Sequence, residues 1–278
     1  RRMRRPSALA IVTWLYVAWS LLPVIIAIRF AFNETRSRTS AEGFSLRWFW
    51  TDPTLSVRND PTLLATLEHS VVLAALAMLI ATPLGVALAI GLQRWRGRGS
   101  GVSNVLMLLP LVTPELVLAV GLFLLFTSLF SFVGLGTTAQ VIGQVTFSLS
   151  WVVLIVRGRL VMIGNDVEEA AADLGAPPFE RLRRVLLPLL MPAIAASVLT
   201  VFALSIDDFV VTQYMASGAD TTTVPMRIYA TARAAPTPAL NALATILLVL
   251  SLLALVLAWL AFRRLSRGQK TQLETFAA

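Results

Sequence analysis

The chain has 278 residues, of which 57% are hydrophobic and only 14% are charged, and its mean hydropathy is +0.77. This composition excludes a water-soluble globule, which could not cover its surface with so few polar groups, and the net charge of +8 lies on arginines that flank apolar runs, so nucleic-acid binding is not expected. The absence of cysteine and the single histidine, His69, exclude disulfides, cysteine nucleophiles and a metal cluster.

Six apolar stretches are long enough to cross a hydrocarbon core, which needs about 20 helical residues. We expect transmembrane helices over residues 8–32, 67–92, 102–125, 140–161, 186–206 and 240–262, joined by polar loops. No strand-like alternation of polar and apolar residues stands out. The sequence therefore predicts an all-α integral membrane protein, in which residues 1–278 form one domain of six transmembrane helices.

Arginines gather before the first span, after the second, around the loop that follows the fourth, and after the last. These positions hold 16 of the 23 lysines and arginines, namely Arg1, Arg2, Arg4, Arg5, Arg94, Arg96, Arg98, Arg157, Arg159, Arg181, Arg183, Arg184, Arg263, Arg264, Arg267 and Lys270. Cytoplasmic loops are enriched in positive charge. We therefore expect both termini, the loop 93–101 and the loop 162–185 in the cytoplasm.

Prolines occur inside several predicted spans, at Pro23, Pro83, Pro110, Pro114 and Pro192. Tolerated kinks explain most of them, but Pro110 and Pro114 differ because an acidic residue, Glu115, follows directly. In a straight helix beginning near residue 102, Glu115 would lie about 20 Å from the cytoplasmic end, beyond the middle of the bilayer. We expect this carboxylate to face protein or water.

The stretch EEAAADLGAPP, residues 168–178, is a polar island between two apolar runs. Asp166 and Glu169 have the spacing of a capping box, which predicts that a short helix begins there. Gly175 suits a left-handed residue after its end, and Pro177 and Pro178 forbid extension while suiting the start of a second helix. The pattern predicts a tight helix–turn–helix.

The predicted turn carries two apolar residues, Leu174 and Phe179, beside small alanines. Such a knob could insert into a groove of another protein. The alternative interpretation is a polar loop that only joins two spans.

Glu169-Ala170-Ala171, three residues, Gly175, nine residues and then Val185-Leu186-Leu187-Pro188 resemble the EAA motif of ATP-binding-cassette importer permeases, with valine in place of isoleucine. The resemblance implies the type I importer permease fold, and it implies that the loop 162–185 docks on an ATP-binding subunit. The contacting residues would be Glu168, Glu169, Ala170, Ala171, Asp173, Leu174, Gly175 and Phe179. Gly97, Gly99 and Gly101 lack the ending of a phosphate-binding loop, so ATP hydrolysis is expected on a separate subunit and the chain is not expected to be an enzyme.

Four further stretches are similar to the permeases of spermidine/putrescine importers: HSVVLAALAMLIATPLG, LLPLVTPELVLAVGLFLLF, ALSIDDFVVTQYMASG and VPMRIYATARAAPTPALNALATILLVLSL. This resemblance implies polyamine import across a bacterial cytoplasmic (inner) membrane. It also implies a second, non-identical permease, a dimer of ATP-binding subunits and an extracytoplasmic polyamine-binding protein, and no cofactor. Another small solute on the same scaffold is the alternative.

A polyamine carries several ammonium charges, so its path needs carboxylates or aromatic faces. Glu115, Asp207, Asp208 and Tyr214 are the candidate substrate contacts. Because adjacent helical residues point about 100° apart, we expect only one of the two aspartates to face the path. Two alternatives stay open: a nearby cation such as Arg227 or Arg233 balances the aspartates, and Tyr214 is a membrane-interface residue.

Two other protein classes remain as alternatives. An ion- or proton-coupled transporter or channel could also have six spans and an intramembrane acid, and a membrane enzyme could use paired carboxylates. Neither class requires the EAA loop, and the chain supplies no convincing catalytic set.

Overall fold

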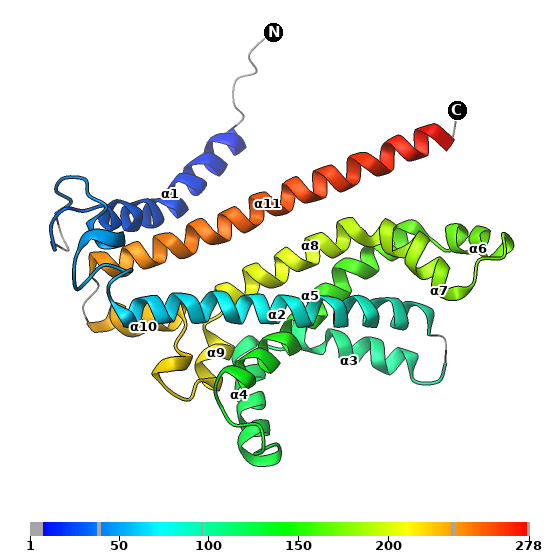
Figure 1. Cartoon of the computed structure of the whole chain (residues 1–278), viewed down its shortest axis with the longest axis horizontal. Helices are drawn as coiled ribbons and strands as arrows, with labels where there is room; N and C mark the ends of the chain where they lie inside the picture. Colours follow the sequence, from blue (N-terminus) through cyan, green and yellow to red (C-terminus); the bar gives the residue numbers. More distant parts are fainter. Residues whose placement is uncertain (1–7, 38–39, 96, 235–236, 277–278) are drawn as a thin grey trace, which may run out of the picture. The chain divides into compact units, whose positions relative to one another are not determined.

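The computed structural model describes residues 8–37, 40–95, 97–234 and 237–276, and these residues are mostly helical and contain no β-strand (Figure 1). This confirms the predicted all-α class. The chain divides into two compact units. Unit 1 comprises Arg1–Leu67 and Arg227–Val249, and unit 2 comprises Glu68–Met226 and Leu250–Ala278.

Eleven α-helices are found within the described residues. They are α1 (Ala8–Ala31), α2 (Pro61–Arg94), α3 (Ser100–Val112), α4 (Glu115–Leu124), α5 (Thr137–Ile163), α6 (Asp166–Asp173), α7 (Pro178–Glu180), α8 (Leu187–Ile206), α9 (Val210–Met215), α10 (Val224–Ala234) and α11 (Pro238–Phe276). A π-helical stretch, Arg181–Leu186, joins α7 to α8, so that Pro178–Ile206 is one continuous helix. The predicted fifth span therefore begins eight residues earlier than expected.

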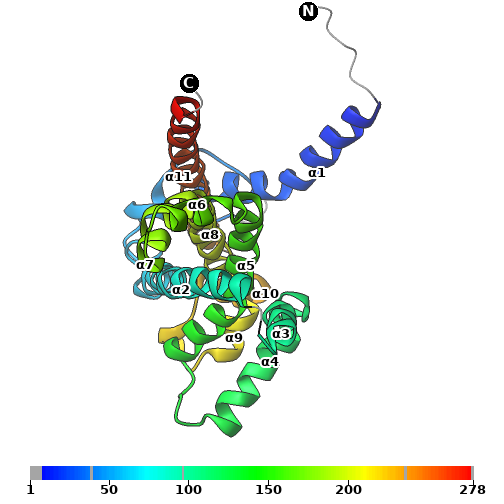
Figure 2. The same ribbon diagram turned by 90° about the vertical axis from the view of Figure 1, so that its right-hand side faces the viewer.

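Five described helices are long and apolar enough to cross a membrane, and the count reaches six if the bent pair Ser100–Val112 and Glu115–Leu129 is one span. The prolines at positions 23, 83 and 192 remain inside α1, α2 and α8. The expectation of a continuous helix over residues 102–125 is wrong, because α3 and α4 meet at 107°. Figure 2 shows α4 leading away from α3 at this break.

Pro114 explains why the chain breaks where it does. The ring of a proline disfavours the helical conformation for the preceding residue. Thr113 accordingly adopts an extended conformation, with φ −71° and ψ 131°, and its hydroxyl donates to the Leu109 carbonyl at 2.7 Å. The neighbouring Pro110 stays inside α3. Glu115 therefore lies at the first residue of a new helix, and not past the middle of a straight one.

The core of unit 2 lies where α2, α5 and α8 pack together. Small residues on α2, including Ala77, Ala81 and Ala89, are fully buried against valines of α5. A Cβ at Gly85 would lie 2.5 Å from the Cβ of Val152, so the two helices approach too closely for any side chain there. Within a bilayer, small residues of this kind let helix backbones approach and gain van der Waals contact.

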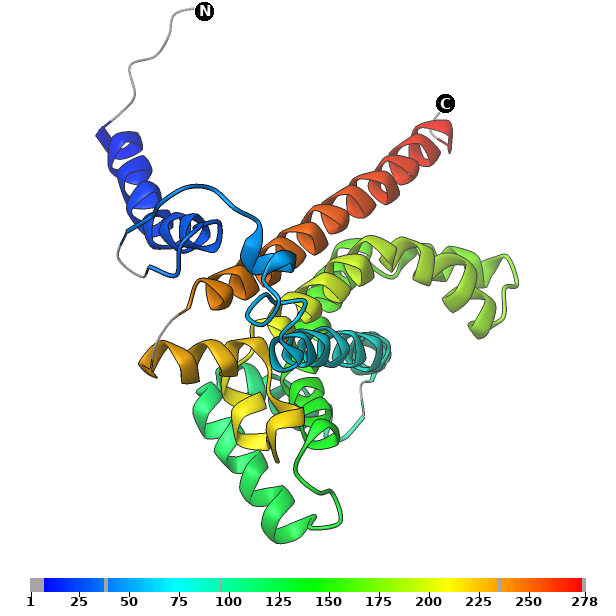
Figure 3. The same ribbon diagram turned by 60° about the vertical axis from the view of Figure 1, so that its left-hand side comes forward.

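A second cluster in unit 2 joins α4, α5 and α9. Its buried residues are Ala119, Leu122, Phe126, Ala139, Val211 and Met215. Figure 3 shows α9 beside α4, on the side of unit 2 away from α6 and α7. The two polar regions with candidate functional residues thus lie at different ends of this unit.

The segment between α1 and α2, predicted as a polar loop, is folded within unit 1. Trp48 is buried and its indole donates to the Asn33 carbonyl at 2.5 Å. The buried Asp52 accepts hydrogen bonds from the amides of Leu55 and Thr54 and from Arg47. Burial alone would raise the pKa of Asp52, but these three partners outweigh it and lower the pKa from 3.8 to about 2.

Candidate functional site

Residues 165–186 form the predicted helix–turn–helix, and we call them the coupling segment after the role that the EAA resemblance implies. Gly175 has φ +83°, a left-handed conformation that favours glycine. The Gly175 amide donates to the Ala172 carbonyl at 2.8 Å and the Ala176 amide donates to the Ala171 carbonyl at 3.0 Å. This is the Schellman arrangement, in which the last carbonyls of a helix are satisfied by the residues that turn the chain.

The start of α6 differs from the expectation. Asp166 is the first helical residue and not its cap, and the preceding Asn165 makes no side-chain capping bond. Instead, the amides of Glu168 and Glu169 both donate to the Asn165 carbonyl at 3.0 Å. The three acidic residues of the first turn, Asp166, Glu168 and Glu169, still suit the positive end of the helix.

Two large apolar side chains of the coupling segment are exposed to the outside. Leu174 is 90% exposed and Phe179 is 69% exposed, although both are large hydrophobic residues. Among the other predicted contact residues, Glu169, Ala170 and Asp173 are also exposed, whereas Glu168 and Ala171 are partly buried. The exposed set is therefore available to a partner.

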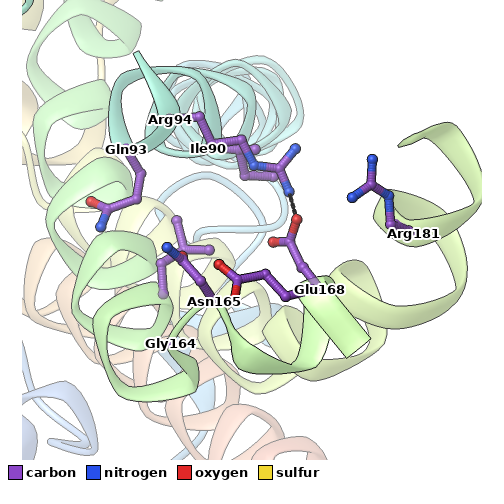
Figure 4. Close-up of a pocket in the computed structure, with 9 residues that line it drawn as sticks. Ile90, Gln93, Arg94, Gly164, Asn165, Glu168 and Arg181 are labelled. Carbon is purple, nitrogen blue, oxygen red and sulfur yellow. Dashed lines mark hydrogen bonds and ion pairs between the residues drawn. The ribbon is translucent and has the colours of Figure 1, made fainter. Parts of the chain in front are cut away.

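A pocket of about 250 Å³ lies behind α6, between the ends of α2 and α5 and the turn that starts α8 (Figure 4). Glu168 and Arg94 form an ion pair across it. Arg181 faces the same pocket, and its Nε is buried without a hydrogen-bond partner. Glu168 thus belongs to the inner side of the coupling segment and Leu174 to its outer side.

The second region lies around the α3–α4 break and the turn between α8 and α9. Glu115 begins α4, and Asp207 follows the last residue of α8. The carboxyl groups of Glu115 and Asp208 lie within interaction range of each other, as do those of Asp207 and Asp208. The break between α3 and α4, which was not expected from the sequence, thus accompanies the approach of Glu115 to Asp208.

The two aspartates have different surroundings. The Asp208 carboxylate accepts hydrogen bonds from the Thr212 amide at 2.9 Å and the Val211 amide at 3.3 Å, so it caps α9. It also accepts one from the Gln144 amide nitrogen at 3.3 Å. Asp207 is exposed, and among the side chains that the structure describes it has no salt-bridge partner.

Two buried glutamines, one turn apart on α5, hold this region together and were missed by the sequence reasoning. Gln140 is 0% exposed and donates to the carbonyls of Thr212 at 3.1 Å and Thr221 at 2.8 Å. Because both of its amide hydrogens are used, its oxygen must accept from His69 Nε2, which lies 2.8 Å away. His69 therefore carries a proton on Nε2.

Gln144 repeats the pattern one turn further along α5. It is 2% exposed, donates to the Ser205 carbonyl at 3.2 Å, and accepts a hydrogen bond from the Ser205 hydroxyl. In the sequence, the pattern that could have revealed these residues is a pair of glutamines four positions apart in an otherwise apolar span. Polar groups inside a membrane need hydrogen-bond partners, so such a pair indicates contacts with other helices.

The remaining candidate residues are Tyr214, Arg227 and Arg233. Tyr214 is half-exposed on α9, with its ring 6.4 Å from that of Phe123 on α4 in an edge-on contact. Arg227 donates to the hydroxyl of Thr62 at 3.3 Å within unit 1, and the side chain of Arg233 lies outside the described residues. No described group of three or more histidine, aspartate or glutamate side chains could hold a metal ion.

The comparisons with known proteins agree with this architecture. Residues 81–267 match the family described as the binding-protein-dependent transport system inner membrane component. The chain is 35% identical over 268 residues to the spermidine/putrescine transport system permease protein PotC of Escherichia coli K12, covering 96% of this chain and 97% of that protein. It is 32% identical over 225 residues to the molybdenum transport system permease protein ModB of Mycobacterium bovis, covering 76% and 82%.

Among solved structures, a chain of a bacterial ABC transporter that imports the acidic polysaccharide alginate shares the fold, with a TM-score of 0.75 and 16% identity over 92% of this chain and 94% of that one. The predicted fold class is thereby confirmed. With its apolar helices, the chain is a multi-pass protein of the cytoplasmic membrane, and it belongs to the family of inner membrane components of binding-protein-dependent transport systems.

Proposed function

We propose that this chain is a permease subunit of an ATP-driven polyamine importer and forms half of the translocation pathway for spermidine and putrescine. The similarity to PotC, which extends over nearly the whole chain, supports the solute class. The observation that carries the importer assignment is the coupling segment, whose Schellman turn presents Leu174 and Phe179 to the outside. An exposed apolar knob of this kind fits a groove in a partner.

Transport would proceed by alternating access. A loaded extracytoplasmic binding protein docks on one face, ATP binding closes a dimer of ATP-binding subunits on the other, and the coupling segment carries that closure to the spans. Hydrolysis on those subunits resets the pathway. Because the described residues supply at most six helices that could cross a membrane, a second, non-identical permease would complete the pathway. The alginate transporter structure with its bound periplasmic protein supports an assembly of this kind.

The polar region near the α3–α4 break would receive the cationic solute. Glu115 and Asp207 are exposed carboxylates, and their neighbour Asp208 is already engaged in capping α9. A polyamine is attracted by uncompensated carboxylates in a low-dielectric path. Tyr214 adds an aromatic face in the same part of unit 2. The solute-binding role of these four residues is part of the proposal.

Another solute on the same scaffold is the specific alternative, because the related ModB is a molybdenum transport permease. The test is uptake into vesicles that contain the full assembly, using radiolabelled spermidine, putrescine and molybdate as probes. We expect ATP-dependent uptake of the two amines and not of the anion. Uptake of molybdate alone would refute the polyamine assignment and retain the importer.

The topology belongs to the same proposal, with the termini, the loop 93–101 and the coupling segment in the cytoplasm. The chain has no cysteine, so single cysteines can be placed without interference. A cysteine at Ser100 should be shielded from an impermeant thiol reagent in intact cells, and one at Ser217 should be labelled. The opposite labelling pattern would reverse the topology.

A further inference from the structure

Arginines that the sequence marks only as cytoplasmic charges cross-link helices of unit 2. Arg157 on α5 donates to Asn104 Oδ1 on α3 at 2.6 Å and to Gln93 Oε1 on α2 at 3.4 Å. Arg159, also on α5, donates to the Leu189 carbonyl on α8 at 3.2 Å. These bonds tie the ends of the spans to one another at the side of unit 2 where the coupling segment lies.

The Arg94–Glu168 ion pair does the same for the coupling segment itself. Arg94 is the last residue of α2, and Glu168 lies in the first turn of α6, so the pair joins parts of the chain 74 residues apart. The two elements are separated by the pocket, which the pair spans (Figure 4). The ion pair is therefore a side-chain connection between α6 and the end of a transmembrane helix that does not adjoin it in sequence.

The surroundings favour retention of this pair. Glu168 is only 21% exposed at its side chain, and a second guanidinium, that of Arg181, lines the same pocket. A charge that is partly removed from water depends more on its partner than a fully exposed one does. If α6 moved without α2, the Arg94–Glu168 ion pair would break, and the side chains that line the pocket would have to rearrange around both charges.

We propose that the Arg94–Glu168 ion pair makes α2 follow the coupling segment, so that motion of α6 reaches α2 directly as well as through α5 and α8. This inference rests on the proposed function, because it gives the ion pair a positioning role within the coupling step. Glu168 then acts through Arg94, while Leu174 and Phe179 meet the ATP-binding subunit. The pair remains closed throughout the cycle.

The test uses Arg94→Gln, Glu168→Gln and the charge exchange that combines Arg94→Glu with Glu168→Arg, each in the full assembly in vesicles. The measured quantity is labelled spermidine transported per ATP hydrolysed. We expect each single variant to lower this ratio roughly two- to five-fold, the change that corresponds to a partly exposed ion pair. The exchange should restore the ratio in part, because it places an arginine in the first turn of α6 near Arg181. Arg98→Gln, an exposed arginine in the same loop, should leave the ratio unchanged.

A second measurement asks whether the pair must open. Arg94→Cys and Glu168→Cys are combined in this cysteine-free chain and joined with a bifunctional thiol reagent. Cross-linked assemblies should keep at least half of the transport of the uncrosslinked double variant. Arrest on cross-linking, or an unchanged ratio in both single variants, overturns the proposal. If instead the wild-type assembly shows no ATP-dependent uptake, the proposed function fails, which separates the two results.

Discussion

The coupling segment and the acidic region of unit 2 interrupt the apolar chain in opposite ways. The turn of the coupling segment satisfies its backbone groups with its own residues, and the side chains of Leu174 and Phe179 are exposed, that of Leu174 to 90%. The acidic region buries its amides, with Gln140 at 0%, and leaves Glu115 and Asp207 exposed. The turn of the coupling segment is closed by its own residues, whereas the acidic region is held by bonds between distant helices.

This difference indicates how each region tolerates change. A turn that is closed by its own residues can present a docking surface without support from the rest of the fold. A region held by Gln140 and Gln144 of α5 depends on the correct approach of four further segments, namely α2, α8, α9 and the turn at residues 219–221. We therefore expect surface substitutions in the coupling segment to affect association, and core substitutions near the acids to affect stability.

The largest effect is expected for Leu174→Asp. An apolar anchor at the centre of an interface contributes about 2–4 kcal/mol, so its replacement by a charge should weaken association with the ATP-binding subunits roughly 30-fold or more. Co-purification of the subunits and ATP-dependent uptake report the loss. The matched variant Leu174→Met keeps volume and polarity and should retain both. Normal association of the aspartate variant would remove Leu174 from the docking surface.

Gln140→Leu tests how much the buried hydrogen bonds of the acidic region contribute to stability. The substitution leaves the carbonyls of Thr212 and Thr221 and the Nε2 proton of His69 without their partner. We expect a loss of about 2 kcal/mol in the free energy of unfolding in detergent, because buried polar groups lose hydrogen bonds. The exposed Gln213→Leu on α9 is the control and should change it by less than about 0.5 kcal/mol. Equal effects of the two variants would mean that the hydrogen bonds of Gln140 contribute nothing to the free energy of unfolding.

We expect substitutions of Glu115, Asp207 and Asp208 to have different effects on transport and stability. Glu115→Gln and Asp207→Asn remove exposed charges, so each should raise the apparent KM for spermidine about five-fold, equivalent to about 1 kcal/mol, without altering thermal stability. Asp208→Ala should lower stability as well, because it removes the cap of α9, whereas Asp208→Asn keeps a capping side chain. Three acids with identical phenotypes would contradict this division.

The smallest effect is expected for Asp52, a buried acidic residue of unit 1. It lies outside both regions compared above and serves as a reference for a carboxylate held by local hydrogen bonds. Its pKa is lowered to about 2 in the fold, so its stabilising contribution is complete above pH 3.8 and is lost as the pH falls toward 2. Hydrogen–deuterium exchange over residues 47–59 should show protection that decreases in this window. In Asp52→Asn the protection should be lower and independent of pH there. A variant with the wild-type pH profile would assign the transition to another group.

Much of the coupling segment could be predicted from local sequence. Gly175 supplies the left-handed turn, Pro178 begins the next helix, and Leu174 is exposed because it lies in that turn. The apolar runs likewise predicted where helices occur. These features depend on interactions within a few residues, or on the length of an apolar run, so the order of residues along the chain was sufficient to determine them.

Only the tertiary structure decided which polar groups meet. Pro114 was visible in the sequence, but the 107° break and the approach of Glu115 to Asp208 were not. The partnership of Gln140 with His69, and that of Arg94 with Glu168, joins residues more than 70 positions apart. Such pairs form when helix packing brings particular side chains together, and no local preference encodes that choice. The sequence determined the helices and the coupling turn, whereas packing determined the polar contacts between them.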